Sequence, residues 1–110
     1  MTLLRVGSLP DDPLAASAAW HAEVLPQVLR VLDDGTSALT LVFTSADYAH
    51  RDWRRAVVAT LARERAPARI NAIAADDEAA IAAAERYLAS AEAITGHYVS
   101  LDGAGAGPVL

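Results

Sequence analysis

Hydrophobic positions alternate along this chain between short continuous runs and longer stretches with helical spacing. The four short runs predict β-strands, and they cover Thr2–Val6, Ala38–Thr44, Arg69–Ile73 and Tyr98–Leu101. The run at 38–44 is apolar on both faces, which is typical of a strand inside a parallel sheet whose two faces are both covered.

The stretch between the first two runs predicts a helix. Asp11-Asp12-Pro13 offers a capping side chain followed by a proline at the first helical position, and the helix should extend towards Leu32. Its inward stripe consists of Leu25, Val28, Leu29 and Leu32. Pro26 lies inside this stretch and lacks an N–H group, so we expect a kink or break near Val24.

Two further helices are predicted in the intervals that follow. One begins at Tyr48 or Asp52 and continues to about Arg65, with an inward stripe of Ala56, Val57, Thr60 and Leu61. The other spans about 79–90 and follows the acidic cap Asp76-Asp77-Glu78.

The order of these elements is βαβαβαβ, and each crossover is long enough to be helical. That order predicts an α/β fold: one sheet of about four mostly parallel strands, with three main helices packed on it in two or three layers. A chain of 110 residues is the size of one domain. We place that domain at residues 1–103 and expect 104–110 to be a flexible C-terminal tail.

Composition excludes several function classes. There is no cysteine, so disulfides and cysteine nucleophiles are excluded, and all nine basic residues are arginine, so no lysine is available as a proton relay. The net charge of −5 disfavours nucleic acid as a partner. The chain has no apolar run of transmembrane length, and Met1–Arg5 lacks the basic start of a signal peptide. We therefore expect a cytoplasmic protein that does not bind membranes.

A set of short sequence phrases in the second half of the chain recurs in a known family. In chain order the phrases are Leu61-Ala-Arg-Glu64, Ala66-Pro67, Arg69-Ile-Asn-Ala-Ile-Ala74, Leu88-Ala-Ser90, Ile94-Thr-Gly96 and Leu101-Asp-Gly103. Together they resemble the C-terminal half of the short-chain dehydrogenase/reductase family, and the likeness extends back to about Pro26. The resemblance implies a truncated, degenerate relative of that family with a truncated Rossmann-like sheet, whose first strand corresponds to the family's fourth strand.

The part of the family that binds the dinucleotide has no counterpart in this sequence. As the resemblance implies, that part contains a glycine-rich turn whose backbone approaches the pyrophosphate at a helix N-terminus. Gly7 is the only glycine before Gly35, and no helix follows the glycine-alanine run at 103–107. Ala75-Asp76 also stands where the family commonly has the Pro-Gly that receives the nicotinamide. We therefore expect no cofactor, neither NAD nor NADP.

The family's catalytic residues are also out of register. The resemblance implies a serine, a tyrosine and a lysine four residues after the tyrosine, where the lysine lowers the tyrosine pKa for proton transfer. Ser45 is the only residue at a matching position, whereas Asp47 and Arg51 stand at the tyrosine and lysine positions. Tyr48 is one residue out of register, and Pro13 stands where the family has a helper asparagine. We expect no catalytic residue and no dehydrogenase activity in the isolated chain.

Two other kinds of site are also unsupported. Ser45, Asp47 and His50 have the residue types of a hydrolase triad, but the chain has no Gly-x-Ser-x-Gly elbow and residues so close in sequence rarely face one another. His21, His50 and His97 stand on three different predicted elements without a ligand spacing. We expect no metal site and interpret the three as surface or interface histidines.

The resemblance implies that the first two helices form a subunit interface, because the family's fourth and fifth helices make its main subunit contact. Trp20 and Trp53 lie on the corresponding helices, with Arg54 and Arg55 beside Trp53, and both residue types are enriched at binding hot spots. The alternatives are a core position for the tryptophans and a solvated face for the arginines. As the first strand, Thr2–Val6 would in addition expose an unpaired sheet edge.

Three functions remain open from the sequence. The first is a non-catalytic reductase-like subunit that forms a homo-oligomer or a heteromer with a full-length reductase. The second is a subunit that completes a composite NAD(P)-dependent active site with another chain. The third is a small-molecule binding module that uses the crevice at the carboxyl ends of the strands, around Ser45 and Ala75.

Overall fold

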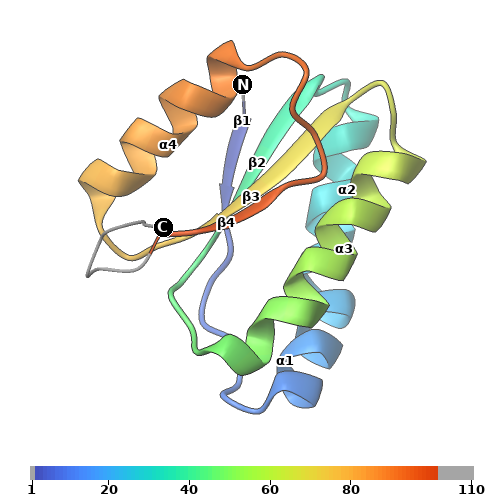
Figure 1. Ribbon diagram of the computed structural model, residues 1–110. Coiled ribbons are helices and arrows are strands. Elements are labelled where there is room, and N and C mark those ends of the chain that lie inside the picture. The colour runs from blue at the N-terminus through green and yellow to red at the C-terminus, as the bar shows by residue number, and fades with distance from the viewer. Residues whose placement is uncertain (1, 102–110) are drawn as a thin grey trace.

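The computed structural model describes residues 2–101 and contains one four-stranded parallel sheet (Figure 1). Its strands are β1 (Thr2–Arg5), β2 (Ala38–Phe43), β3 (Arg69–Ala74) and β4 (Tyr98–Ser100), in that spatial order. All three pairings are parallel, and within residues 2–101 β1 and β4 form the two edges of the sheet. The predicted α/β fold is confirmed, and each predicted strand is present to within about one residue at either end.

Helices cover both faces of the sheet, so the fold has three layers. α1 (Pro13–Ala19), α2 (Leu25–Asp33) and α3 (Arg51–Glu64) lie on one face, and α4 (Glu78–Ser90) lies on the other (Figure 1). A short 3₁₀ turn, η2 (Tyr48–His50), precedes α3. Of the two layer arrangements that the sequence leaves open, the structure has the three-layered one.

The two faces of the sheet carry cores of different size. Side chains at alternate positions of β2 and β3 pack on the face of α1, α2 and α3, and they are Leu39, Leu41, Phe43, Ile70, Ala72 and Ala74. On the α4 face the cluster is smaller and consists of Val42, Ile73, Ala75, Ile81 and Leu88. Because α4 is rich in alanine, most of the large buried side chains gather on the other face.

The first predicted helix is interrupted, as its internal proline predicts. Between α1 and α2 the chain forms a π-helical segment, Trp20–Val24, after which the Leu25 N–H donates to the Trp20 carbonyl five residues back. Pro26 follows directly and has no N–H to offer the carbonyl four residues before it. The expected break is therefore confirmed, and it takes the form of one wider turn rather than an end to the helix.

The inward face of α3 differs from the predicted one. The predicted stripe is Ala56, Val57, Thr60 and Leu61, whereas the buried residues are Arg54, Val58, Leu61 and Ala62. The prediction is confirmed for Leu61 and wrong for Ala56 and Thr60, which are exposed. Arg54 turns inward instead and packs its guanidinium over the Phe43 ring, which a search for apolar periodicity does not register. Ala56, Val57 and Thr60 instead line a groove towards the neighbouring helices.

The sequence also predicts the location of the protein and the nature of its C-terminal residues. None of the helices in residues 2–101 is long and apolar enough to span a membrane. A cytoplasmic location stays a prediction. The flexible tail predicted at 104–110 lies outside the described residues.

Candidate functional site

The carboxyl ends of β1 and β2 open onto a small polar cleft of about 330 Å³. Its walls are the loop after β1, the loop after β2 and the start of α3. The lining residues are Leu9, Pro10, Asp11, Thr44, Ser45, Ala46, Asp47, His50 and Arg54. Parallel α/β sheets place ligand sites at this edge, because the loops that follow the strands converge there.

Ser45 lies in this cleft without the partners that proton transfer requires. Its backbone N–H donates to the Asp76 carboxylate at 3.0 Å, and the residue is exposed. Tyr48 is 76% exposed, and its ring lies 5.4 Å from the Arg51 guanidinium. Within residues 2–101 no hydrogen bond joins Ser45 to Tyr48.

His50 is buried, with an exposed fraction of 6%, and this corrects the expectation of a surface histidine. The Trp53 Nε1–H group lies 3.1 Å from its Nδ1 atom, and its Nε2 atom lies 2.8 Å from the Asp11 carbonyl oxygen. An indole nitrogen only donates and a carbonyl only accepts, so the proton of the neutral ring is on Nε2. Both ring nitrogens are occupied by structural partners, and neither is free to act as a base on Ser45.

Arg54 is the second buried polar residue of the cleft, with an exposed fraction of 3%. Its Nη1 atom donates to the Thr44 carbonyl at 2.9 Å and to the Tyr98 hydroxyl at 3.2 Å. The guanidinium carbon lies 4.5 Å from the centre of the Phe43 ring, within the cation–π range. Arg54 is thus held inside the domain, which corrects its assignment to an exposed interface.

Trp20 is another residue for which the sequence predicts a place at an interface. It is fully buried, and its ring centre lies 5.4 Å from that of Phe43 and 6.4 Å from that of Trp53. Trp20 is therefore a core residue, which is the alternative that the sequence leaves open. Trp53 is half-buried and Arg55 is exposed, and for these two the interface role stays a prediction.

The histidines outside the cleft are used locally. His21 and His97 are exposed, and the Nδ1 atom of each lies within hydrogen-bond distance of a nearby backbone carbonyl, Ser17 at 2.8 Å and Thr95 at 3.1 Å. Within the part of the chain that the structure describes, no group of three or more acidic or histidine side chains is arranged to hold a metal ion.

The fold and the position of this cleft can be set beside known proteins. The profile of a family described as short chain dehydrogenase-like protein (SDR-like) matches residues 4–101. This chain belongs to the SDR-like family. No curated protein and no solved structure matches it significantly. The family match takes in all or part of every helix and strand described above, so the resemblance seen in the short sequence phrases is confirmed across the whole fold.

Family membership raises the question of a nicotinamide dinucleotide, and the described residues of this SDR-like chain do not fit one. Three helix starts follow strand ends at the carboxyl edge, and an aspartate caps each of them: Asp12 before α1, Asp47 before η2 and α3, and Asp77 before α4. Each carboxylate accepts a backbone N–H at 2.9 to 3.1 Å. A pyrophosphate binds a helix N-terminus through those same N–H groups, and an aspartate carboxylate repels its charge.

The glycines of the SDR-like chain do not form a phosphate-binding loop either. Gly35 follows α2 and Gly96 precedes β4, and both have positive φ angles, 103° and 78°. Gly7 follows β1 but precedes the helix that Asp12 caps. Further acidic residues at the carboxyl edge add to the negative charge, and they are Asp11, Asp76 and Glu78.

We expect the SDR-like chain to bind NADPH no more tightly than a dissociation constant of about 1 mM, because the capped helix starts leave no site for the phosphates. Isothermal titration calorimetry of NADPH into the purified chain measures this. An NADPH-dependent short-chain reductase, titrated under the same conditions, is the positive control. A micromolar dissociation constant for the SDR-like chain would show that its carboxyl edge has been misread.

His50 and Arg54 are the cleft residues that the sequence reasoning did not assign to this edge of the SDR-like fold. They are four residues apart, so they lie on one face of the helical segment that begins after the β2 loop. That spacing directly after a buried strand is the signal that could have identified both side chains as pointing into the domain.

Proposed function

We propose that this chain is a non-catalytic SDR-like subunit that functions by association, through the face formed by α1, the π-helical segment, α2 and α3. The observation that carries the proposal is an apolar groove of about 360 Å³ between these helices. The resemblance to short-chain dehydrogenases/reductases supports this use, because the corresponding helices form the main subunit contact of those enzymes.

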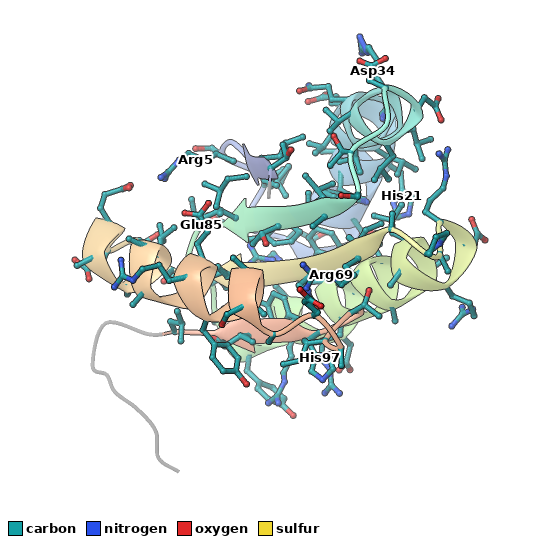
Figure 2. All side chains as sticks on the ribbon, turned by 90° about the horizontal axis from the view of Figure 1, so that it is seen from above. Arg5, His21, Asp34, Arg69, Glu85 and His97 are labelled. Carbon is teal, nitrogen blue, oxygen red and sulfur yellow. The ribbon has the colours of Figure 1, made fainter. Side chains whose placement is uncertain are left out.

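The groove combines an apolar interior with exposed margins. Its buried or half-buried apolar residues are Trp20, Leu25, Leu29, Trp53, Val57 and Leu61, and its exposed residues are His21, Ala56, Thr60 and Glu64. Figure 2 shows His21 on the side of the molecule where α2 and α3 face each other. Ala56 and Val57 of the stripe predicted on α3 therefore line the groove between the helices. An apolar surface that is not covered by the rest of the domain is typical of a docking site.

A second copy of the chain is the occupant that the charges on α3 favour. Asp52 near the start of α3 and Arg63 near its end are both exposed, and neither forms an ion pair within residues 2–101. They are 11 residues apart, which is close to three helical turns, so they share one face with Ala56. In an antiparallel pair of α3 helices related by a two-fold axis, Asp52 of each copy lies opposite Arg63 of the other.

We expect Thr60→Arg to weaken dimerisation by about tenfold or more, because it places a charge and a long side chain in the groove. Thr60 is exposed in the single chain, so the fold should be unaffected. Tyr87→Arg is the matched control, since Tyr87 is 62% exposed on α4, on the other face of the sheet, and does not line the groove. Sedimentation velocity over a concentration series gives the dimer dissociation constant of each variant. Equal effects of the two variants would argue against this groove.

A charge exchange distinguishes a second copy from a different partner. Asp52→Arg alone should weaken self-association, and adding Arg63→Asp in the same chain should restore it, because the two positions oppose each other in the proposed dimer. If the purified chain instead associates only with a coexpressed full-length reductase, the second-copy assignment is wrong and the heteromer takes its place.

A further inference from the structure

From the buried cation in the cleft at the carboxyl edge we infer a binding site for a small zwitterion. The carboxylate of the ligand pairs with the Arg54 guanidinium, and its positively charged group faces Asp11 and Asp47. This site lies apart from the helix groove, so it does not depend on the proposed association.

Arg54 carries a charge that the described residues do not balance. Its side chain is buried, yet the ion pairs within residues 2–101 are Arg5–Glu78 and Arg65–Asp33, and neither includes it. Its Nε–H group is buried and has no hydrogen-bond partner. Buried charges in proteins are normally paired, because removing an ion from water costs several kcal/mol. An anionic ligand would supply the missing partner.

The guanidinium is also held in one place. Its Nη1 atom bonds the Thr44 carbonyl and the Tyr98 hydroxyl, and its carbon lies over the Phe43 ring and 5.8 Å from the centre of the Trp53 ring. These contacts fix the plane of the guanidinium and use one of its two terminal nitrogens. A fixed, planar donor group is suited to a carboxylate, which accepts two parallel hydrogen bonds.

The margin of the cleft has the opposite charge from its interior. Asp11 and Asp47 are exposed cleft residues, and neither forms an ion pair within the described chain. The Asp47 carboxylate caps the turn before α3, and the Asp11 backbone carbonyl accepts from His50. Leu9 and Pro10 add an apolar wall. The cleft therefore has a positive charge in its interior, on Arg54, and negative charges at its margin, so it favours a molecule that carries both a carboxylate and a cationic group.

The same margin disfavours a phosphate ligand. A phosphate dianion would be attracted by one positive charge, on Arg54, and repelled by two negative charges, on Asp11 and Asp47. Asp76 adds a third carboxylate nearby, which accepts a hydrogen bond from the Ser45 N–H. Like charges in a partly enclosed site repel more strongly than in open water. Between the two common anions that arginine recognises, the electrostatics favour a carboxylate on a molecule of zero net charge.

The test follows the Arg54 Nε–H resonance by NMR in chain labelled with ¹⁵N-arginine, during titration with three probes. We expect 4-(aminomethyl)benzoate, a zwitterion, to shift this resonance and to saturate with a dissociation constant of about 1 mM. Benzylamine lacks the carboxylate and should leave the resonance unchanged. Phenyl phosphate should bind about tenfold more weakly than the zwitterion or not at all.

Three variants complete the experiment. Asp11→Asn should weaken binding of the zwitterion several-fold, whereas Asp34→Asn removes the same charge at the end of α2, outside the cleft, and should have no effect (Figure 2). Arg54→Gln should abolish binding, and its backbone amide spectrum reports whether it is folded. If Arg54→Gln does not fold, the titrations of the wild-type chain and the comparison of Asp11→Asn with Asp34→Asn test the proposed site.

Several results would overturn the inference. The zwitterion could leave the Arg54 resonance unchanged at a concentration ten times the expected dissociation constant, or benzylamine could shift that resonance as much as the zwitterion does. Phenyl phosphate could bind more tightly than the zwitterion. Asp102, which lies outside the described residues, provides the last check: if Asp102→Asn moves the Arg54 resonance in the free chain and the zwitterion does not, the chain itself satisfies the guanidinium.

Discussion

Replacing Trp20 by alanine is expected to lower the free energy of unfolding by about 3–5 kcal/mol, the range for large aromatic residues removed from a core. Trp20 is fully buried and its ring contacts those of Phe43 and Trp53. Its removal opens a cavity where the π-helical segment meets β2, and the loss is a large fraction of the 5–15 kcal/mol or so that stabilises a typical domain. Urea denaturation followed by far-UV circular dichroism measures the change.

Trp20→Phe provides the matched comparison. It keeps an aromatic ring against Phe43 and removes an indole N–H that is buried without a hydrogen-bond partner. We expect it to cost clearly less than the alanine variant, because the loss of volume is smaller and an unpaired polar group is removed. If both variants were as stable as the wild type, Trp20 would have to be exposed, as an interface residue would be.

Replacing Asn71 by leucine is expected to cost about 2 kcal/mol or more, because it removes both hydrogen bonds of a buried amide and leaves their two backbone partners unpaired. Asn71 is 1% exposed on β3; its Nδ2 group donates to the Ile94 carbonyl at 3.1 Å, and its Oδ1 atom accepts from the His97 N–H at 3.0 Å. These two bonds hold the loop between α4 and β4, so they set the register in which β4 pairs with β3.

The effect of Asn71→Leu should be local as well as global. Hydrogen exchange should accelerate at the amides of Gly96 and His97, which bond to the Ile70 carbonyl and to Asn71 itself. Thr95→Val is the milder control, since Thr95 is exposed and contributes a single hydrogen bond to the Ile70 N–H. Unchanged stability and protection in Asn71→Leu would mean that the loop is held by other contacts.

Local signals in the sequence were sufficient for the architecture of this chain. The continuous apolar run of β2 predicts a strand covered on both faces, and all six of its residues are buried. Pro26 predicts the interruption of the first helix because the missing N–H group acts within one turn. The caps before α1 and α4 depend on three or four adjacent residues, so they are legible without the rest of the fold.

The side chains of the candidate site depend on contacts that are distant in sequence. Arg54 is buried because the Thr44 carbonyl, directly after β2, and the Tyr98 hydroxyl, on β4, offer it hydrogen-bond acceptors. His50 is buried because the Asp11 carbonyl, 39 residues earlier, accepts its proton. Charge alone predicts an exposed position for the arginine, and only the assembled sheet edge shows otherwise. Trp20 is buried in the single chain for the same reason, since its neighbour Phe43 lies on another element.

If this SDR-like chain associates through its helix groove, the mass of the purified chain in solution should be that of a dimer. Multi-angle light scattering of the purified chain at micromolar concentration should give twice the 11.5 kDa of one chain. The same measurement after coexpression with a full-length reductase shows whether the second copy is displaced. A stable 11.5 kDa monomer that also fails to join such a reductase would contradict the account.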